Sequence, residues 1–137
     1  MHKPFDRDMF EKVDSLAREA TKKYISSRGY EAIDNPNKYG ADLIVEGVCY
    51  VECECKLVWD SLNFPYKTIH LPTRKEKFTK LDMPCCFFIW NKQFSSAIKF
   101  TSSDVLKSPK KEVPNKEIKS GEYFFDLDVN KLEQIYA

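Results

Sequence analysis

Two short apolar runs joined at a glycine constrain the fold of this chain more than any other feature. The segment 42–51 is apolar on both sides of Gly47, and glycine at the tight position of such a turn predicts a β-hairpin. Side chains alternate between the two faces of a strand, so Glu52, Glu54 and Lys56 are expected on one face. Three ionisable groups in a row do not serve core packing, and this face is therefore the first candidate for chemistry.

Carboxylates at this spacing can hold a divalent cation. Asp42 begins the first run, Glu54 lies on the polar face of the second, and carboxylate oxygens are ligands that Mg²⁺ and Mn²⁺ prefer. Lys56 beside them would position a water and offset phosphate charge, and Glu52 would be either an added ligand or a base holding a metal-bound water. These are the components of metal-assisted phosphodiester hydrolysis. The alternative is an exposed strand face, with Lys56 only a salt-bridge partner of Glu54.

The same residues carry a family resemblance. Asp42, eleven intervening residues and then Glu54-x-Lys56 resembles the pattern of PD-(D/E)XK nucleases, which include restriction enzymes, archaeal Holliday-junction resolvases and small phage endonucleases. Ala41 replaces the proline of that pattern, but Gly40-x-Asp42 is a frequent form in the group. The resemblance spans residues 19–56. It implies an α/β fold with a restriction-endonuclease-like core, a mixed central sheet flanked by helices.

Two further residues enter through the resemblance. A backbone carbonyl next to the second motif carboxylate also binds metal in the family, and here that carbonyl belongs to Cys55. Glu19 corresponds in order to an acidic residue on the first helix of many members. At about 100° per residue, Glu19 lies about 130° from the centre of the apolar stripe, which favours a surface role over a catalytic one.

Size and composition bound the remaining possibilities. The 137 residues suit one domain, 1–137, and 42% hydrophobic with 14% aromatic residues indicates a folded globule. No apolar run approaches the roughly 20 residues of a membrane span, and no secretory signal is recognisable. We therefore expect a cytoplasmic protein. A phage-encoded protein that acts in the cytoplasm of its host is one such case. Five cysteines without a CxxC pair and only two histidines indicate reduced thiols rather than a zinc site.

Charge is unevenly distributed along the chain. Residues 61–120 hold 12 basic and 5 acidic side chains, a net of +7, whereas residues 1–60 carry a net of −3. A basic segment beside an acidic hairpin suits a polyanion such as DNA. The cations expected to contact phosphates are Lys67, Arg74, Lys75 and Lys77. The alternative is that these lysines are solvated on surface loops.

Periodicity and turn residues predict the remaining elements. A helix over 6–28 is expected to end at Gly29, followed by a loop over 34–40 and the hairpin 41–57. Thr73 and Glu76 form a capping-box pattern that predicts a helix to Leu81, with Phe78 and Leu81 facing inward. Further expectations are strands over 66–71, 85–90, 97–100 and 123–127, a helical turn at 102–104, a basic loop over 107–121 and a terminal helix over 129–136.

The sequence thus predicts a Mg²⁺- or Mn²⁺-dependent DNA endonuclease. Family members of this size often act as homodimers, so that two sites address two strands, and branched or junction DNA is the most specific substrate expected. Two alternatives stay open. One is a nucleic-acid-binding or assembly protein that keeps the fold without cleavage, and the other is an RNA endonuclease.

Overall fold

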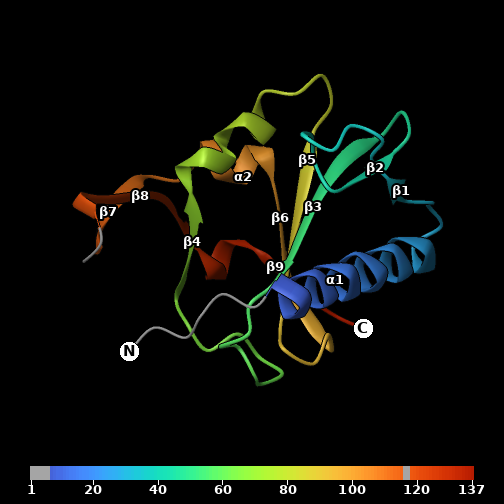
Figure 1. The fold of residues 1–137 in the computed structure, drawn as a ribbon, viewed down its shortest axis with the longest axis horizontal. Coiled ribbons are helices and arrows are strands. Elements are labelled where there is room, and N and C mark those ends of the chain that lie inside the picture. Colours follow the sequence, from blue (N-terminus) through green and yellow to red (C-terminus); the bar gives the residue numbers. More distant parts are fainter. Residues whose placement is uncertain (1–6, 116–117) are drawn as a thin grey trace.

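A six-stranded mixed sheet forms the centre of the molecule. The structure, a computed structural model, describes residues 7–115 and 118–137 (Figure 1). The strands follow the order β1-β2-β3-β5-β6-β9, and only the pair β3 and β5 is parallel. Their bounds are β1 Ile33–Asp34, β2 Leu43–Val45, β3 Cys49–Cys55, β5 Cys85–Trp90, β6 Ser96–Thr101 and β9 Glu133–Tyr136.

One long helix covers one face of this sheet. Helix α1, Arg7–Ser27, packs against β3 through a buried stripe that includes Thr21. The indole N–H of Trp90 donates to the Thr21 hydroxyl oxygen at 2.8 Å, which ties the helix to β5. At its end Gly29 has φ +88°, and the Tyr30 N–H donates to the Ile25 carbonyl at 3.2 Å. The helix and its glycine cap are confirmed.

The expected hairpin is also present. Gly47 has φ +73° at the turn, the Val48 N–H donates to the Val45 carbonyl at 2.9 Å, and β2 pairs antiparallel with β3. Leu43, Val45, Val51 and Cys53 face α1, so the polar residues of β3 face the other way.

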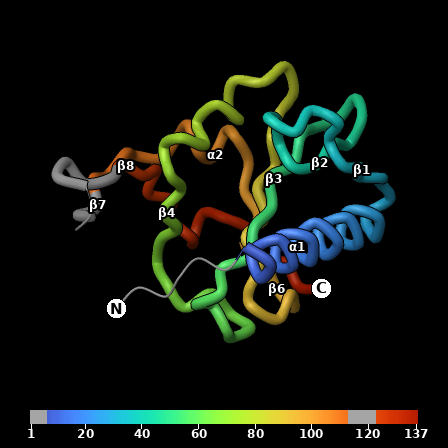
Figure 2. Tube along the Cα trace, viewed as in Figure 1, coloured from blue at the N-terminus to red at the C-terminus, as the bar shows by residue number. Residues whose placement is uncertain are grey.

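A second sheet covers that other face. Its strands β4 (Thr68–Pro72), β8 (Ile118–Asp128) and β7 (Lys110–Asn115) are antiparallel. Ile69, Leu71 and Leu127 pack onto Phe87 and other residues of the main sheet to form a core separate from the one under α1. In Figure 2, β4 and β8 lie on one side of the central strands and α1 on the other.

The segment after β4 departs from the expected helix. Residues Thr73–Thr79 form a 3₁₀ helix, η1, whose N-cap is Pro72, and no side-chain hydrogen bond caps it. The capping-box prediction at Thr73 is therefore wrong. Phe78 is buried as expected, but Leu81 is 36% exposed. The capping box lies instead at Thr101 and Asp104, where it opens α2, Ser102–Leu106, near the predicted helical turn.

Two predictions for the C-terminal third are wrong. The segment 107–121 contains β7 and the start of β8 rather than a basic loop, although residues 116–117 lie outside the described chain. The expected terminal helix is a short 3₁₀ turn, η2 (Val129–Lys131), followed by β9 at the edge of the main sheet. In both places pairing with a distant strand overrides the local sequence pattern.

The coarse fold class is confirmed, since the chain is α/β with a mixed sheet and few helices. The predicted strands over 85–90 and 97–100 correspond to β5 and β6, and the expected strand over 66–71 is β4 of the second sheet. In the described ranges no helix is both long and apolar enough to cross a membrane.

Candidate active site

The hairpin register brings Asp42 opposite Glu52. Leu43 pairs with Val51, so the residue before β2 faces the residue after Val51. The Asp42 N–H donates to Glu52 Oε2 at 3.0 Å, and the Cys53 N–H donates to Asp42 Oδ2 at 3.0 Å. Two carboxylates are thereby fixed at the open end of the hairpin, on the face opposite α1.

A lysine from another element completes the cluster. Lys75 of η1 donates from Nζ to Glu52 Oε1 at 2.7 Å, and the side chains of Lys75 and Glu52 are 23% and 7% exposed. Aromatic packing holds η1 in place, because Phe78 is buried beneath it and Lys75 lies 5.6 Å from the centre of its ring. The sequence placed Lys75 among residues that contact phosphates, whereas in the structure it neutralises a buried carboxylate.

Burial and like charge shift the proton equilibrium of Glu52. Burial, reinforced by a hydrogen bond and repulsion from the Asp42 carboxylate, raises the pKa of Glu52 to about 7, and Lys75 offsets this only in part. For Lys75, burial alone would lower the pKa, but the attraction of Glu52, and then of Glu54 and Asp42, outweighs it and raises the pKa. The cluster therefore holds a firmly protonated lysine and two acids that compete for charge.

The other motif residues lie further along β3. Glu54 is exposed and lines a small pocket together with Glu52, Lys75, Leu71 and Ile89. Lys56 follows the end of β3, four residues or about 13 Å beyond Glu52. Among described residues it forms no ion pair, and its N–H donates to a β5 carbonyl.

Cys55 belongs to that same distal end. Its thiol donates to the Asn91 carbonyl at 3.4 Å, so the side chain is directed away from the carboxylate face, as expected. Cys53 follows Glu52 as Cys55 follows Glu54, and the Cys53 N–H donates to the Asp42 carboxylate. The structure brings Asp42, Glu52 and Lys75 together and leaves Cys55 and Lys56 outside this cluster.

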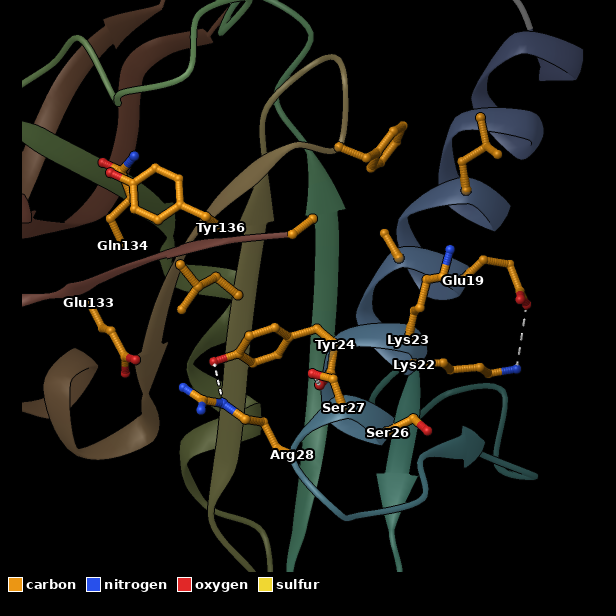
Figure 3. Close-up of a pocket in the computed structure, with 15 residues that line it drawn as sticks. Glu19, Lys22, Lys23, Tyr24, Ser26, Ser27, Arg28, Glu133, Gln134 and Tyr136 are labelled. Atoms are coloured by element: carbon orange, nitrogen blue, oxygen red, sulfur yellow. Dashed lines mark hydrogen bonds and ion pairs between the residues drawn. The ribbon is translucent and has the colours of Figure 1, made fainter.

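Glu19 lies on the other side of the sheet. It is exposed on α1, and its carboxylate is 3.7 Å from the Lys22 ammonium at the rim of a broad groove between α1 and β9 (Figure 3). The same groove is lined by Tyr24, whose hydroxyl accepts from Arg28 Nε at 3.2 Å. No described contact joins Glu19 to Asp42 or Glu52, which matches its expected surface role.

The remaining predicted phosphate contacts are exposed. Arg74 and Lys77 flank Lys75 on η1, and Lys77 lies 5.0 Å from the centre of the Phe78 ring. Lys67 precedes β4, and its carbonyl accepts from the Val129 N–H at 3.0 Å. Within the described chain none of these three cations forms an ion pair, so their charges are available to a polyanion.

The chemistry of the carboxylate pair fits a hard divalent cation. The Asp42 carboxylate raises the pKa of Glu52, and Lys75 offsets this only in part, so a proton or a divalent cation would relieve the remaining repulsion. The described residues contain no group of three or more His, Cys, Asp or Glu side chains arranged for a metal. A Mg²⁺ site commonly has only one or two protein carboxylates, with waters and phosphates as the other ligands. The pair therefore fits Mg²⁺ or Mn²⁺ better than Ca²⁺ or Zn²⁺.

The sequence contained part of the signal for this arrangement. Counting back from the turn at Gly47 pairs Asp42 with Glu52, so the carboxylate directly opposite Asp42 is Glu52 rather than Glu54. Lys75 supplies a positive charge beside Glu52. The contribution of Lys75 depends on how η1 packs and has no local sequence signal. No known family model and no curated protein matches this chain.

Proposed function

We propose that this protein is a divalent-metal-dependent endonuclease that hydrolyses phosphodiester bonds in DNA. The observation that carries the proposal is the Asp42–Glu52 carboxylate pair with Lys75 donating to Glu52 at 2.7 Å. Few structural needs explain two mutually repelling acids and a lysine, all partly or fully withdrawn from water, on one face of a hairpin. Their types and arrangement resemble the acidic pair and lysine of PD-(D/E)XK nucleases.

Each residue of the cluster has a distinct task in this proposal. Asp42 and Glu52 would hold Mg²⁺ or Mn²⁺. Such an ion supplies Lewis-acid stabilisation of phosphate charge and lowers the pKa of a bound water. Lys75 orients the Glu52 carboxylate and favours its ionised form, and its remaining N–H donors can stabilise negative charge on a phosphate oxygen. Glu54, exposed on the same face, can hold a water by accepting its hydrogen bond.

The substrate is proposed to be duplex or branched DNA, bound by a homodimer so that two sites address two strands. Arg74 and Lys77 share η1 with Lys75, Lys67 precedes β4, and all three are exposed and available to neutralise phosphates. Cleavage of RNA, or binding of nucleic acid without cleavage, are the competing functions. Incubation with supercoiled, linear and four-way-junction DNA and with RNA, each in Mn²⁺ and in EDTA, separates them.

Two lysine variants distinguish the structural assignment from the sequence motif. We expect Lys75→Ala to lower the cleavage rate at least about 100-fold, because it removes a donor that acts on the transition state. Lys56→Ala makes the same chemical change about 13 Å away and should cleave like wild type. Supercoiled-plasmid nicking rates in Mn²⁺ measure both. If Lys56→Ala is inactive and Lys75→Ala active, the motif is Glu54-x-Lys56 and Lys75 is only a salt-bridge partner.

A further inference from the structure

Three reactive side chains from three neighbouring strands share the α1 face of the main sheet. Cys86 of β5 is in register with Val51 of β3, and Cys49 lies two residues before Val51 on the same face. Both cysteines are half-buried and pack against the core under α1. Lys99 of β6, opposite Phe88, faces the same way, and its ammonium lies 3.9 Å from the Glu133 carboxylate.

The pKa values of the two thiols shift in opposite directions. The two thiols lie close enough for each to shift the pKa of the other. Although burial opposes it, the interaction with Cys49 together with Lys99 lowers the pKa of Cys86 to about 7. The same interaction, with burial, raises the pKa of Cys49. Cys86 is thus the nucleophile of the pair, and Cys49 lies beside it with a proton to give.

The other three cysteines lack these features. Cys53 and Cys85 are buried, and burial raises the pKa of both. Cys55 is half-buried like Cys86, but burial and the Glu54 carboxylate raise its pKa to about 11. Cys55 is therefore a matched control, because it is half-buried like Cys86 but its pKa is not lowered.

We propose that Cys86 and Cys49 form a peroxide-sensitive dithiol, in which Cys86 is the attacking thiol and Cys49 resolves the product as a disulfide. The site is independent of the proposed nuclease activity. In the first step the Cys86 thiolate attacks the peroxide, the O–O bond breaks, and a proton completes an alcohol or water as Cys86 becomes a sulfenic acid. In the second, the Cys49 sulfur displaces hydroxide from that sulfenic acid, and the Cys49 proton leaves with it as water.

The position of Cys49 allows the bond to close. A disulfide needs the sulfurs to approach to about 2.05 Å, closer than a hydrogen-bonded pair. Cys49 is the first residue of β3, directly after the turn at Gly47. Diagonal neighbours on adjacent strands have Cα atoms about 7–8 Å apart, so closure requires Cys49 to move toward Cys86 and to give up its pairing with Val45 of β2.

Thiol chemistry on the full chain tests this directly, without an activity assay. At pH 7 iodoacetamide should alkylate Cys86 about 10- to 100-fold faster than Cys55, because thiolate fraction outweighs the lower nucleophilicity of a more acidic thiol. One equivalent of hydrogen peroxide should then give a species about 2 Da lighter, with the peptides of Cys49 and Cys86 cross-linked. Lys99→Gln should slow the alkylation of Cys86.

Variants assign each role. Cys49→Ser should stop oxidation at a sulfenic acid on Cys86 that dimedone traps, whereas Cys55→Ser should oxidise like wild type. Peptide mapping of the wild-type protein identifies which cysteine reacts first. The test therefore does not depend on whether Cys86→Ser folds. Alkylation of Cys86 no faster than that of Cys55 overturns the proposal. So does a trapped Cys86 sulfenic acid in wild type without a cross-link to Cys49.

Discussion

A carboxylate that is almost fully buried needs an opposite charge nearby, and the charge of Glu52 is compensated only in part. Lys75 donates to it at 2.7 Å, but the Asp42 carboxylate faces it from the hairpin. Buried pairs of this kind add little net stability because desolvation costs as much as the attraction returns. The arrangement therefore indicates chemistry more than structural support.

The pH dependence of stability follows from Glu52. Its pKa in the folded chain is about 7, above the ordinary 4.5, so the folded chain keeps a proton that the unfolded chain releases between these values. Stability contributed by this group is present at low pH and is lost as pH rises from about 4.5 to 7.

Replacing Asp42 should reduce that loss. Asp42→Asn removes a charge that raises the pKa of Glu52, while the amide oxygen can still accept from the Cys53 N–H. In EDTA we expect the variant to match wild type near pH 5 and to be about 1 kcal/mol more stable near pH 8, because one pKa unit corresponds to about 1.4 kcal/mol. Urea unfolding at both pH values measures this. A difference that does not change with pH contradicts the assigned cause.

At the scale of elements, local signals succeed where the structure is local. The stripe of α1 and the glycines at positions 29 and 47 specify a helix, its end and a hairpin without help from the rest of the chain. The residues of β9 suit a helix equally well, and only pairing with β6 makes them a strand. β7 contains Pro114 and several charges and is a strand because β8 lies beside it.

Two threonines separate a real helix cap from an apparent one. The Thr101 hydroxyl accepts from the Asp104 N–H at the start of α2, whereas Thr73 makes no cap bond at η1. Thr101→Ala should therefore cost about 1 kcal/mol in unfolding free energy, and Thr73→Ala should cost a few tenths. Chemical denaturation of both variants measures the contrast. An equal cost for the two would mean that the Thr101 cap contributes no stability.

For the whole molecule, the two faces of the main sheet have different surroundings. One is covered by α1, and the other by the second sheet together with η1 and the acidic cluster. The sequence indicated the charged hairpin and the basic segment separately. It could not show that η1, which carries Arg74 and Lys77, contacts the hairpin carboxylates through Lys75, because this contact depends on long-range packing.

This arrangement predicts which cations bind DNA. The double substitution Arg74→Gln with Lys77→Gln removes two exposed positive charges. In Ca²⁺ buffer it should flatten the slope of the logarithm of the DNA-binding constant against log salt by up to about two units, since each phosphate contact contributes about 0.9. Lys12→Gln with Lys23→Gln makes the same charge change at exposed positions of α1, across the sheet, and should alter the slope little. Fluorescence anisotropy with a labelled duplex measures both. Equal effects would show that only net charge matters.

The central claim is that Asp42 and Glu52 together bind a divalent cation, and calorimetric titration with Mn²⁺ tests it most directly. Each neutral substitution, Asp42→Asn or Glu52→Gln, removes one hard anionic ligand while nearly preserving shape, so Mn²⁺ affinity should fall at least about 10-fold in both. Glu46→Gln makes the same charge change at an exposed position of the hairpin turn and should bind like wild type. Wild-type affinity in both site variants, or no Mn²⁺ binding by the unaltered chain, would contradict the claim.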